Sequence, residues 1–178
     1  MMNGGMMEQK ITHLHQVEST ASDFVVFAET LTYDTNHALE FIDITEDVKS
    51  FVRRSQVNFG QVSITSDHTT AAVIVNENEP LLLNDMARVL ARFAPTGDYY
   101  EHNDFSIRTV NMTSAESANA HSHCQHLLLG GSESLPVHNG SIRLGPWKSI
   151  FFVELDHARP RSIYLQAIGM KKSDIGQG

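Results

Sequence analysis

The feature that most constrains the fold is a pair of strand-like runs joined by Asn139 and Gly140. In LPVH-NG-SIRL these two residues separate two short apolar stretches, and Asn-Gly accepts the positive φ angles of a tight type I′ turn. The run WKSIFFVEL then alternates from Trp147 to Leu155, and SIYLQAIG follows as another strand-like run. We therefore expect the C-terminal part of the chain to form an antiparallel meander.

The N-terminal half contains further strand-like runs. ITHLHQV alternates and places His13 and His15 on one side, where they either flank a pocket or occupy a half-exposed edge strand. DFVVFAET follows as a second strand. QVSIT and TAAVIVNE, separated by a polar break at 66–68, predict a strand pair whose second member is apolar throughout and therefore buried.

Two helices interrupt these strands. The first is expected to begin near Thr45 as N-cap and to end near Arg53 and Arg54, with a core-facing stripe of Val48, Phe51 and Val52. The second is expected to begin at Pro80, because proline suits the first helical position. Its apolar stripe consists of Leu82, Met86, Val89, Leu90 and Phe93.

The segment from Thr113 to Gly131 leaves two alternatives. Thr113 and Glu116 match a capping box and LLLGG supplies a glycine stop, which favours a helix. On a helix His123 and His126 share a face and His121 points almost the opposite way, whereas on a strand His121 and His123 are close neighbours. We favour the helix from Ser122 onward, because the leucines that follow need a core.

Length and composition limit the classes of partner. The chain of 178 residues fits one domain, expected at 10–169 between disordered tails at 1–9 and 170–178. Thirteen basic and 21 acidic residues give a net charge of −8, which disfavours nucleic acid and anionic membranes. A single cysteine, Cys124, no apolar run of membrane-spanning length and no signal-like start predict a cytoplasmic protein.

Histidines in three polar segments suggest chemistry: His68 in SDHTTAA, His102 in YYEHND and His123 in NAHSHCQH. Three neutral imidazoles and an open position make the usual catalytic zinc site. The alternative is that each histidine is a partly buried, hydrogen-bonded residue without a ligand. Sequence spacing does not decide between the two interpretations.

Several of these strings together resemble the YjbQ-like family, which is often labelled secondary thiamine-phosphate synthase. The matching strings are ITEDVKSFV, DHTTAAVIVNEN, YYEHND, NAHSHCQHLLLGGS, LPVHNGSIRLGPWKSIFFVEL and ARPR. The resemblance implies an α+β fold, mainly an antiparallel β-sandwich with two or three helices, assembled as a homotrimer. It also implies that histidines of several segments converge on a metal or anion pocket.

Carried over residue by residue, the resemblance assigns His68, His102 and His123 as metal ligands, with Glu77, Asp85 and Arg159 nearby. The implied cofactor is a divalent metal, Zn²⁺ with Mg²⁺ as the alternative. Glu77 and Asp85 are the expected catalytic residues, as general base or as groups that orient a ligand histidine. Arg159 and Lys148 are the expected contacts to a small phosphorylated molecule.

Two departures qualify this assignment. The family commonly has glutamine where this chain has Lys148, which makes any contact there cationic. His121 and His126 occupy positions that vary in related sequences, which weakens their claim as ligands.

Three functional hypotheses follow. The first is metal-assisted chemistry on a small phosphorylated metabolite, with thiamine phosphate synthesis as the version the resemblance names and phosphoester hydrolysis as an equally physical alternative. Three imidazoles favour zinc-like ions, whereas a synthase that releases pyrophosphate usually uses Mg²⁺ on carboxylates. The second is a non-catalytic trimeric protein that binds a metal or metabolite. The third is that the histidines only line a subunit interface.

Overall fold

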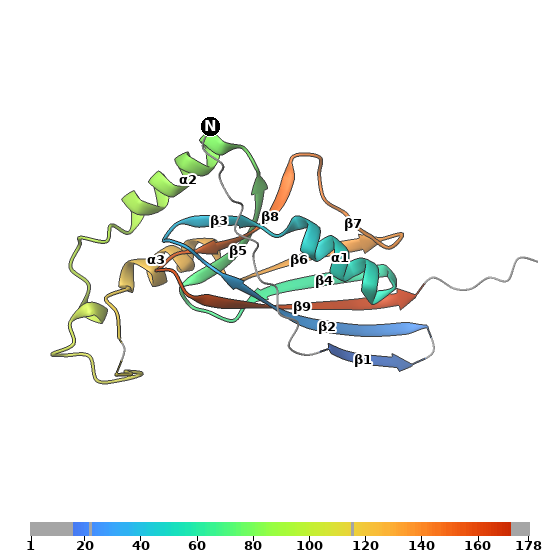
Figure 1. Cartoon of the computed structure of the whole chain (residues 1–178), viewed down its shortest axis with the longest axis horizontal. Helices are drawn as coiled ribbons and strands as arrows, with labels where there is room; N and C mark the ends of the chain where they lie inside the picture. Colours follow the sequence, from blue (N-terminus) through green and yellow to red (C-terminus); the bar gives the residue numbers. More distant parts are fainter. Residues whose placement is uncertain (1–15, 22, 115, 172–178) are drawn as a thin grey trace, which may run out of the picture.

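The structure is a computed structural model that describes residues 16–21, 23–114 and 116–171. Within these ranges it has two antiparallel sheets, one of six strands in the order β1-β2-β9-β4-β6-β7 and one of three in the order β3-β8-β5. Helix α1 covers one face of the larger sheet, while α2 and α3 lie at the end where the smaller sheet is found (Figure 1). The expected α+β class and antiparallel β-sandwich are confirmed.

The elements have the following bounds. The strands are β1 (Gln16–Ala21), β2 (Phe24–Asp34), β3 (Glu40–Asp43), β4 (Val57–Ser66), β5 (Ala71–Glu77), β6 (Ser132–His138), β7 (Ser141–Ile142), β8 (Lys148–Glu154) and β9 (Pro160–Lys171). The helices are α1 (Thr45–Ser55), α2 (Pro80–Phe93), the short 3₁₀ helix η1 (Glu101–Asn103) and α3 (Ala120–Leu129).

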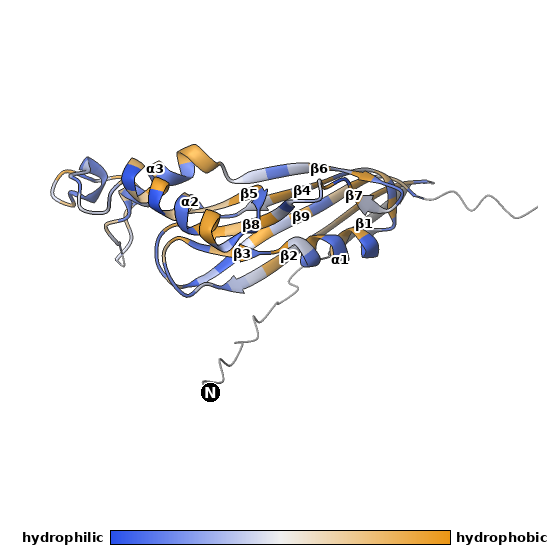
Figure 2. Ribbon diagram, turned by 90° about the horizontal axis from the view of Figure 1, so that it is seen from above, coloured by the Kyte–Doolittle hydropathy of each residue, from blue (hydrophilic) through white to orange (hydrophobic). Residues whose placement is uncertain are grey.

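The main core lies between the two sheets and α1. The predicted stripe of Val48, Phe51 and Val52 is buried there. Hydrophobic and polar stretches alternate along strands of the larger sheet, as a sheet with only one buried face requires (Figure 2). Thr45 is the first helical residue, so the prediction that it is the N-cap is wrong by one position; its backbone N–H donates to Asp43 Oδ1 at 2.9 Å.

Strand β8 is buried on both faces, as the apolar run WKSIFFVEL predicts. Ile150 and Phe152 belong to the main core, whereas Phe151 and Val153 pack in a second cluster with Leu90 of α2. Trp147, just before the strand, is 75% exposed. Strand β8 therefore contributes side chains to both hydrophobic cores, one on each of its faces.

The hairpin at Asn139 and Gly140 is confirmed, with φ angles of 52° and 71° and β6 paired to β7. The expected meander is wrong, because β8 lies between β3 and β5 whereas β9 lies between β2 and β4. QVSIT and TAAVIVNE are both strands, β4 and β5, but they belong to different sheets. A two-residue turn forces the two strands that it connects to pair with each other. Where the connection is longer, the neighbour of a strand is selected by which of its faces must be buried.

The helical alternative for the histidine-rich segment is confirmed from Ala120 onward. Thr113 and Glu116 do interact, since the Thr113 backbone N–H donates to Glu116 Oε1 at 2.9 Å, yet the helix begins only after Asn119. The capping-box pattern therefore stabilises a turn. Arg108 also donates to the Glu116 carboxylate and holds it in the loop.

Helix α2 begins at Pro80 as predicted, but its apolar stripe is mostly not buried. Leu90 is buried, whereas Val89 and Phe93 are 51% and 52% exposed. The helix extends away from the sheets, and residues 94–119, which we call the arm, lead back to α3 (Figure 1). The predicted helical spacing of the stripe is confirmed, and of its five residues only Leu90 is buried.

At the chain ends, β9 continues to Lys171, so residues 170 and 171 belong to a strand and not to the predicted tail. His13 and His15 lie outside the described residues. None of the helices in the described part of the chain combines the length and apolar composition of a membrane span.

Candidate functional site

A cavity of about 330 Å³ lies where β5 and β9 begin and where the arm meets α3; we call it the polar cavity. It is lined by Asp67, His68, Thr69, Thr70, His102, Arg108, Glu116, Asn119, His123, Arg159 and Arg161. Its wall therefore combines the loop between β4 and β5, the arm, the N-terminal part of α3 and the start of β9.

His68 is held in the loop after β4 by its own backbone and by β9. The Ser66 hydroxyl accepts from the His68 N–H at 3.2 Å, and His68 Nε2 accepts from the Ser162 N–H at 2.8 Å. Burial lowers the pKa of His68, and the charge of Arg161 lowers it further. The ring is therefore neutral near pH 7, with its proton on Nδ1.

The floor of the polar cavity is a buried ion pair between Arg161 and Glu154. Their side chains are 3% and 0% exposed, and Arg161 Nε donates to Glu154 Oε2 at 2.6 Å. Arg161 Nη2 donates to the other oxygen of Glu154 and to Thr70 Oγ1 at 3.1 Å. The guanidinium is thus fixed on one edge, and its Nη1 atom has no hydrogen bond to any described residue.

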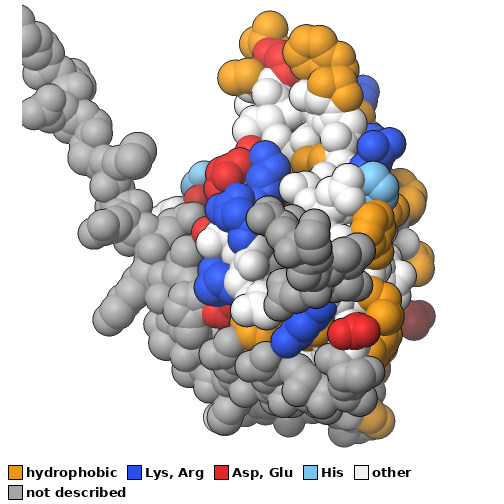
Figure 3. All heavy atoms as spheres, turned by 90° about the vertical axis from the view of Figure 1, so that its right-hand side faces the viewer, with side chains coloured by type: hydrophobic (Ala, Val, Ile, Leu, Met, Phe, Trp, Pro, Cys, Tyr) orange, Lys and Arg blue, Asp and Glu red, His pale blue; other side chains and the backbone are white. Residues whose placement is uncertain are grey.

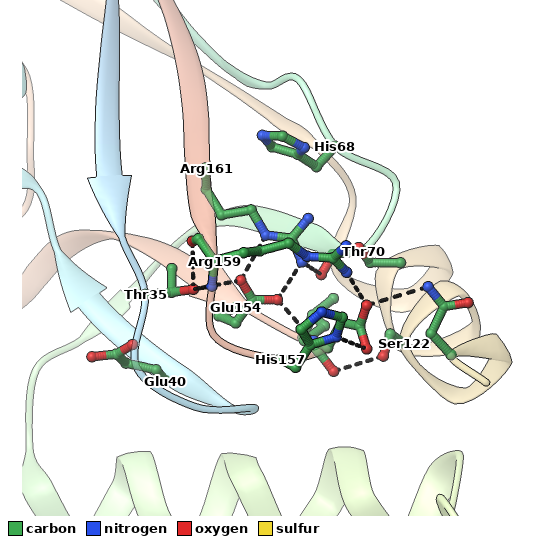
Figure 4. Close-up of polar contacts among 12 residues, drawn as sticks. Thr35, Glu40, His68, Thr70, Ser122, Glu154, His157, Arg159 and Arg161 are labelled. Atoms are coloured by element: carbon green, nitrogen blue, oxygen red, sulfur yellow. Dashed lines mark hydrogen bonds and ion pairs between the residues drawn. The ribbon is translucent and has the colours of Figure 1, made fainter. Parts of the chain in front are cut away.

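Arg159 lies beside Arg161, with His68 close to both, as Figure 4 shows. Arg159 Nη2 is paired with the Asp156 carboxylate, which also accepts from Asn119 Nδ2 at 3.2 Å. Burial opposes ionisation of Asp156, but hydrogen bonds from His157 and Asn119 and the charge of Arg159 outweigh it and lower its pKa. A carboxylate that is ionised near neutral pH therefore positions Arg159.

The arm brings His102 and Arg108 to the opposite wall. Asn103 Oδ1 accepts from the Ala120 N–H at 3.0 Å, which ties η1 to the start of α3. The rings of His102 and His123 then meet edge to face, with centroids 4.9 Å apart. Burial lowers the pKa of His123, and the neighbouring His102 lowers it further.

Arg108 is anchored within the arm. Its Nη1 donates to Glu116 Oε2 at 2.9 Å and its Nη2 to the Asn111 carbonyl at 2.9 Å. Arg108, Arg159 and Arg161 each have a carboxylate partner, and all three line the polar cavity.

Of the residues predicted as site members, the structure brings His68, His102, His123 and Arg159 together around the polar cavity. Glu77 and Lys148 face each other at the far end of the β5–β8 pair, about 20 Å along the strand from Thr70. Asp85 lies on α2 in an exposed ion pair with Arg88. The expectation that Glu77 and Asp85 lie near the histidines, and that Lys148 contacts the same ligand, is therefore wrong within one copy of the chain.

The two other histidines of α3 do not line the polar cavity. His121 is buried, and its Nδ1 has no hydrogen-bond partner in the described part of the chain. His126 lies against Gly131, where a Cβ would approach its Nε2 to 3.0 Å. Of the three histidines of α3, His123 is therefore the one that lines the polar cavity.

The geometry does not fit a three-histidine metal site. Among the described residues no group of three or more His, Cys, Asp or Glu side chains is arranged to hold a metal ion. His68 Nε2 is already occupied by the Ser162 N–H, and the rings of His102 and His123 meet edge to face. We therefore derive no reaction step through a metal.

Sequence reasoning missed Arg161, Arg108, Glu116 and Asn119 as members of the site. Arg161 had a readable signal, because it is in phase with Ile163 and Leu165 on the buried side of an alternating strand. A cation at an inward position indicates a buried ion pair. Arg108 had no such signal, since its position depends on the path of the arm.

Comparisons with known proteins agree with this architecture. Residues 29–170 match the family model described as UPF0047 protein YjbQ-like. A UPF0047 protein of Methanothermobacter thermautotrophicus is 39% identical over 81% of this chain and 93% of its own length. A UPF0047 protein of Bacillus subtilis is 31% identical over 79% of this chain and 98% of its own length.

Solved structures show the same fold. The crystal structure of a YbjQ-like protein of unknown function from Sulfolobus solfataricus matches with a TM-score of 0.74 and 30% identity, over 82% of this chain and 99% of that one. A hypothetical protein from Aeropyrum pernix matches with a TM-score of 0.70 and 31% identity, over 80% and 98%. The chain belongs to the UPF0047, YjbQ-like family.

Proposed function

We propose that the polar cavity binds a small phosphorylated molecule by its phosphoryl group. The observation that carries the proposal is the convergence of Arg108, Arg159 and Arg161 on one cavity of about 330 Å³. Each guanidinium is held on one side by a carboxylate, so its plane is fixed before a ligand arrives. Arginine presents paired N–H groups that match two phosphoryl oxygens.

Charge also favours an anion in the polar cavity. Three arginines line it against two carboxylates, Asp67 and Glu116. Glu116 is paired with Arg108, and Asp67 accepts from the Ser162 hydroxyl at 2.8 Å. The carboxylate partners of Arg159 and Arg161, Asp156 and Glu154, do not line the cavity, so the guanidinium groups and not those carboxylates face a bound phosphate.

The pair of His102 and His123 supplies acid–base chemistry next to this anion site. Because burial keeps His123 neutral near pH 7, its ring can accept a proton from a water that attacks phosphorus. The phosphorus–ester oxygen bond then breaks, and the proton returns to the leaving alkoxide. Phosphoester hydrolysis is the activity we propose for this site, and a binding protein without turnover is the alternative.

The thiamine phosphate synthase activity that the resemblance implies stays a prediction. It is tested by incubating the purified protein with a pyrimidine pyrophosphate and a thiazole phosphate, and by measuring thiamine phosphate. A His123→Gln variant provides the control for a contaminating enzyme.

Replacing Arg159 with glutamine should weaken binding of inorganic phosphate by at least about tenfold, because a charge-assisted hydrogen bond contributes about 1.5–3 kcal/mol. Isothermal titration calorimetry at neutral pH measures the affinity. Arg92→Gln, an exposed substitution on α2 with the same loss of charge, is the matched control and should bind phosphate like the parent. Equal affinity of the Arg159→Gln variant and the parent would contradict the proposal.

Affinity for sulfate should rise as the pH falls from about 8 to about 6. The pKa of His123 is lowered in the free protein, mainly by burial, so its ring is neutral at the start of this range. A bound anion favours the protonated ring, so binding takes up a proton and tightens as protons become more available. Sulfate is the probe because it does not itself titrate near neutral pH. His123→Gln should make the sulfate affinity depend less steeply on pH. An unchanged pH dependence in this variant would show that His123 does not contact the bound anion.

Binding of Zn²⁺, or of Mg²⁺ as the alternative, by the three histidines stays a prediction. Elemental analysis of the untagged protein tests it, since about one metal per chain would require the three histidines to rearrange.

We also propose that the protein is a homotrimer that associates through the outer face of the six-stranded sheet. In β9 the outward positions are Ser162, Tyr164, Gln166, Ile168 and Met170, and their register partners in β2 and β4 are likewise uncharged. Figure 3, an end view, shows hydrophobic side chains along the right-hand margin and at the top of the molecule.

An uncharged outer face is unusual on a sheet that faces water. Three or four strands about 4.8 Å apart and about 30 Å long offer roughly 500 Å² per copy, so the three copies of a trimer would bury about 1,500 Å² in total. Light scattering on the parent and on a Ser63→Lys variant, which places a charge in this face, tests the assembly.

The remaining expectations are a cytoplasmic location and no nucleic-acid or membrane partner. The acidic net charge of −8 supports the lack of nonspecific binding to polyanions. The lone Cys124 is a free thiol, which suits a reducing compartment.

A further inference from the structure

The composition of the cavity wall carries an inference about what is attached to the phosphate. Each residue that lines the polar cavity has a polar side chain. Binding sites for ring-containing metabolites are usually lined mainly by apolar and aromatic side chains, which cover the faces of the ring. Within the described part of the chain, the wall has no aliphatic, Phe, Tyr or Trp side chain, so a heteroaromatic ring would find only imidazole rings and polar groups to pack against.

The polar cavity also presents an unpaired acceptor and an unpaired donor. Asn119 Oδ1 and Arg159 Nε are both shielded from water, and neither has a hydrogen-bond partner among the described residues. A buried polar atom without a partner costs about 1–3 kcal/mol. Both residues belong to the cavity wall, so a molecule bound in the cavity is the candidate partner for these two atoms.

These two atoms require different groups on the ligand. Arg159 Nε needs an acceptor, which a phosphoryl oxygen supplies. Asn119 Oδ1 needs a donor, which the organic part of a phosphate ester supplies through an O–H or N–H group; a hydroxyl is the uncharged donor that a compact ester most simply carries. The Asn119 Nδ2 atom is bound to Asp156, which keeps the oxygen and not the nitrogen as the free group.

We propose that the polar cavity is specific for a compact hydroxylated phosphate ester, of the sugar-phosphate class, over phosphates of heteroaromatic rings. This inference rests on the proposed function, because it assumes that the arginines hold the phosphoryl group. The volume of about 330 Å³ lies at the lower end of the range for small-molecule sites and suits a compact ligand.

The test compares glycerol 3-phosphate with propyl phosphate, which has the same carbon chain and phosphate but lacks the hydroxyls. By calorimetry the parent protein should bind glycerol 3-phosphate about tenfold more tightly, as expected for one hydrogen bond to an otherwise unpaired buried acceptor. A thiazole phosphate should bind no more tightly than propyl phosphate.

Asn119→Ala should remove the preference, so that the two esters bind with equal affinity. The side chain of Asn119 makes no capping hydrogen bond to α3, so the helix does not depend on it. Asn84→Ala, an exposed change of the same type on α2, should keep the tenfold ratio.

Equal affinity of the two esters in the parent protein would overturn this inference and leave the phosphate site intact. Tighter binding of thiazole phosphate than of glycerol 3-phosphate would also overturn it. If the folded parent binds neither ester, the proposed function itself fails. The comparison of ligands in the parent remains decisive even if the Asn119→Ala variant does not fold.

Discussion

Replacing Gly169 with alanine is expected to destabilise the protein by more than about 3 kcal/mol and to leave little soluble folded chain. Gly169 in β9 lies opposite Gly60 in β4, and its φ angle is 157°. A Cβ there would collide with the Phe59 carbonyl oxygen and would lie 2.7 Å from the Cα of Gly60. The contacts are backbone atoms of two paired strands, which have no free space into which to move.

The same argument applies from the other strand, since a Cβ on Gly60 would collide with the Ile168 carbonyl oxygen. Circular dichroism and urea unfolding measure the loss of stability for either variant. Gly97→Ala is the matched control, because a Cβ at Gly97 meets no atom within 4 Å. Its stability should lie within about 0.5 kcal/mol of the parent. Similar unfolding midpoints for Gly169→Ala and Gly97→Ala would refute the close approach of the two strands.

Replacing Glu154 with glutamine or Arg161 with methionine should each cost about 3–5 kcal/mol of unfolding free energy, because each leaves one buried charge without its partner. Glu154 is fully buried and also accepts from the Thr35 hydroxyl at 2.8 Å and from the Asp156 N–H at 2.9 Å. The pair therefore joins β8, β9 and the loop that positions Arg159.

The double variant separates charge pairing from packing. If the cost of each single change is the uncompensated charge, Glu154→Gln combined with Arg161→Met should be less destabilising than the sum of the two, with a coupling of about 1–3 kcal/mol. Urea unfolding of the parent, the two single variants and the double variant gives the free energies for the double-mutant cycle. Strictly additive effects would indicate that the two charges do not interact in the folded protein.

The exposed Lys49–Glu46 pair on α1 is the control for this cycle. Lys49 Nζ and Glu46 Oε1 are 2.8 Å apart, but the side chains of Lys49 and Glu46 are 41% and 77% exposed. Removing Lys49 should change the stability by less than about 1 kcal/mol. The contrast between the two pairs shows the combined effect of burial and of the two-point contact between Arg161 and Glu154.

Local sequence patterns predicted individual elements well. The Asn139–Gly140 turn, the buried stripe of α1 and the start of α2 at Pro80 all follow from interactions within a few residues. Such signals depend on backbone propensity and on side-chain period, which the sequence displays directly. Local signals gave a wrong prediction where the same pattern occurs in two kinds of structure. Thr113 and Glu116 match a capping box, but their contact forms a turn outside the helix.

The candidate site was predictable only in part. The polar segments that contain His68, His102 and His123 could be found in the sequence, and the structure places all three on one cavity. The inward phase of Arg161 indicates a buried ion pair, but its partner Glu154 could not be found, because the two residues come from different strands and meet only through the sheet arrangement. The resemblance placed Glu77 and Asp85 near the histidines, but the direction of β5 carries Glu77 away from the cavity.

The sequence by itself determined which segments are strands and helices, the hairpin at Asn139 and the family, since these depend on short-range geometry and on residue patterns along the chain. Only the tertiary structure decided that β8 and β9 part into different sheets, that three arginines surround the histidines, and that Glu77 lies at the opposite end. The reason is that strand partners and charge pairs between distant residues are selected by burial of whole faces. The free energy of this burial depends on how all the segments pack together, so it cannot be read from any one segment.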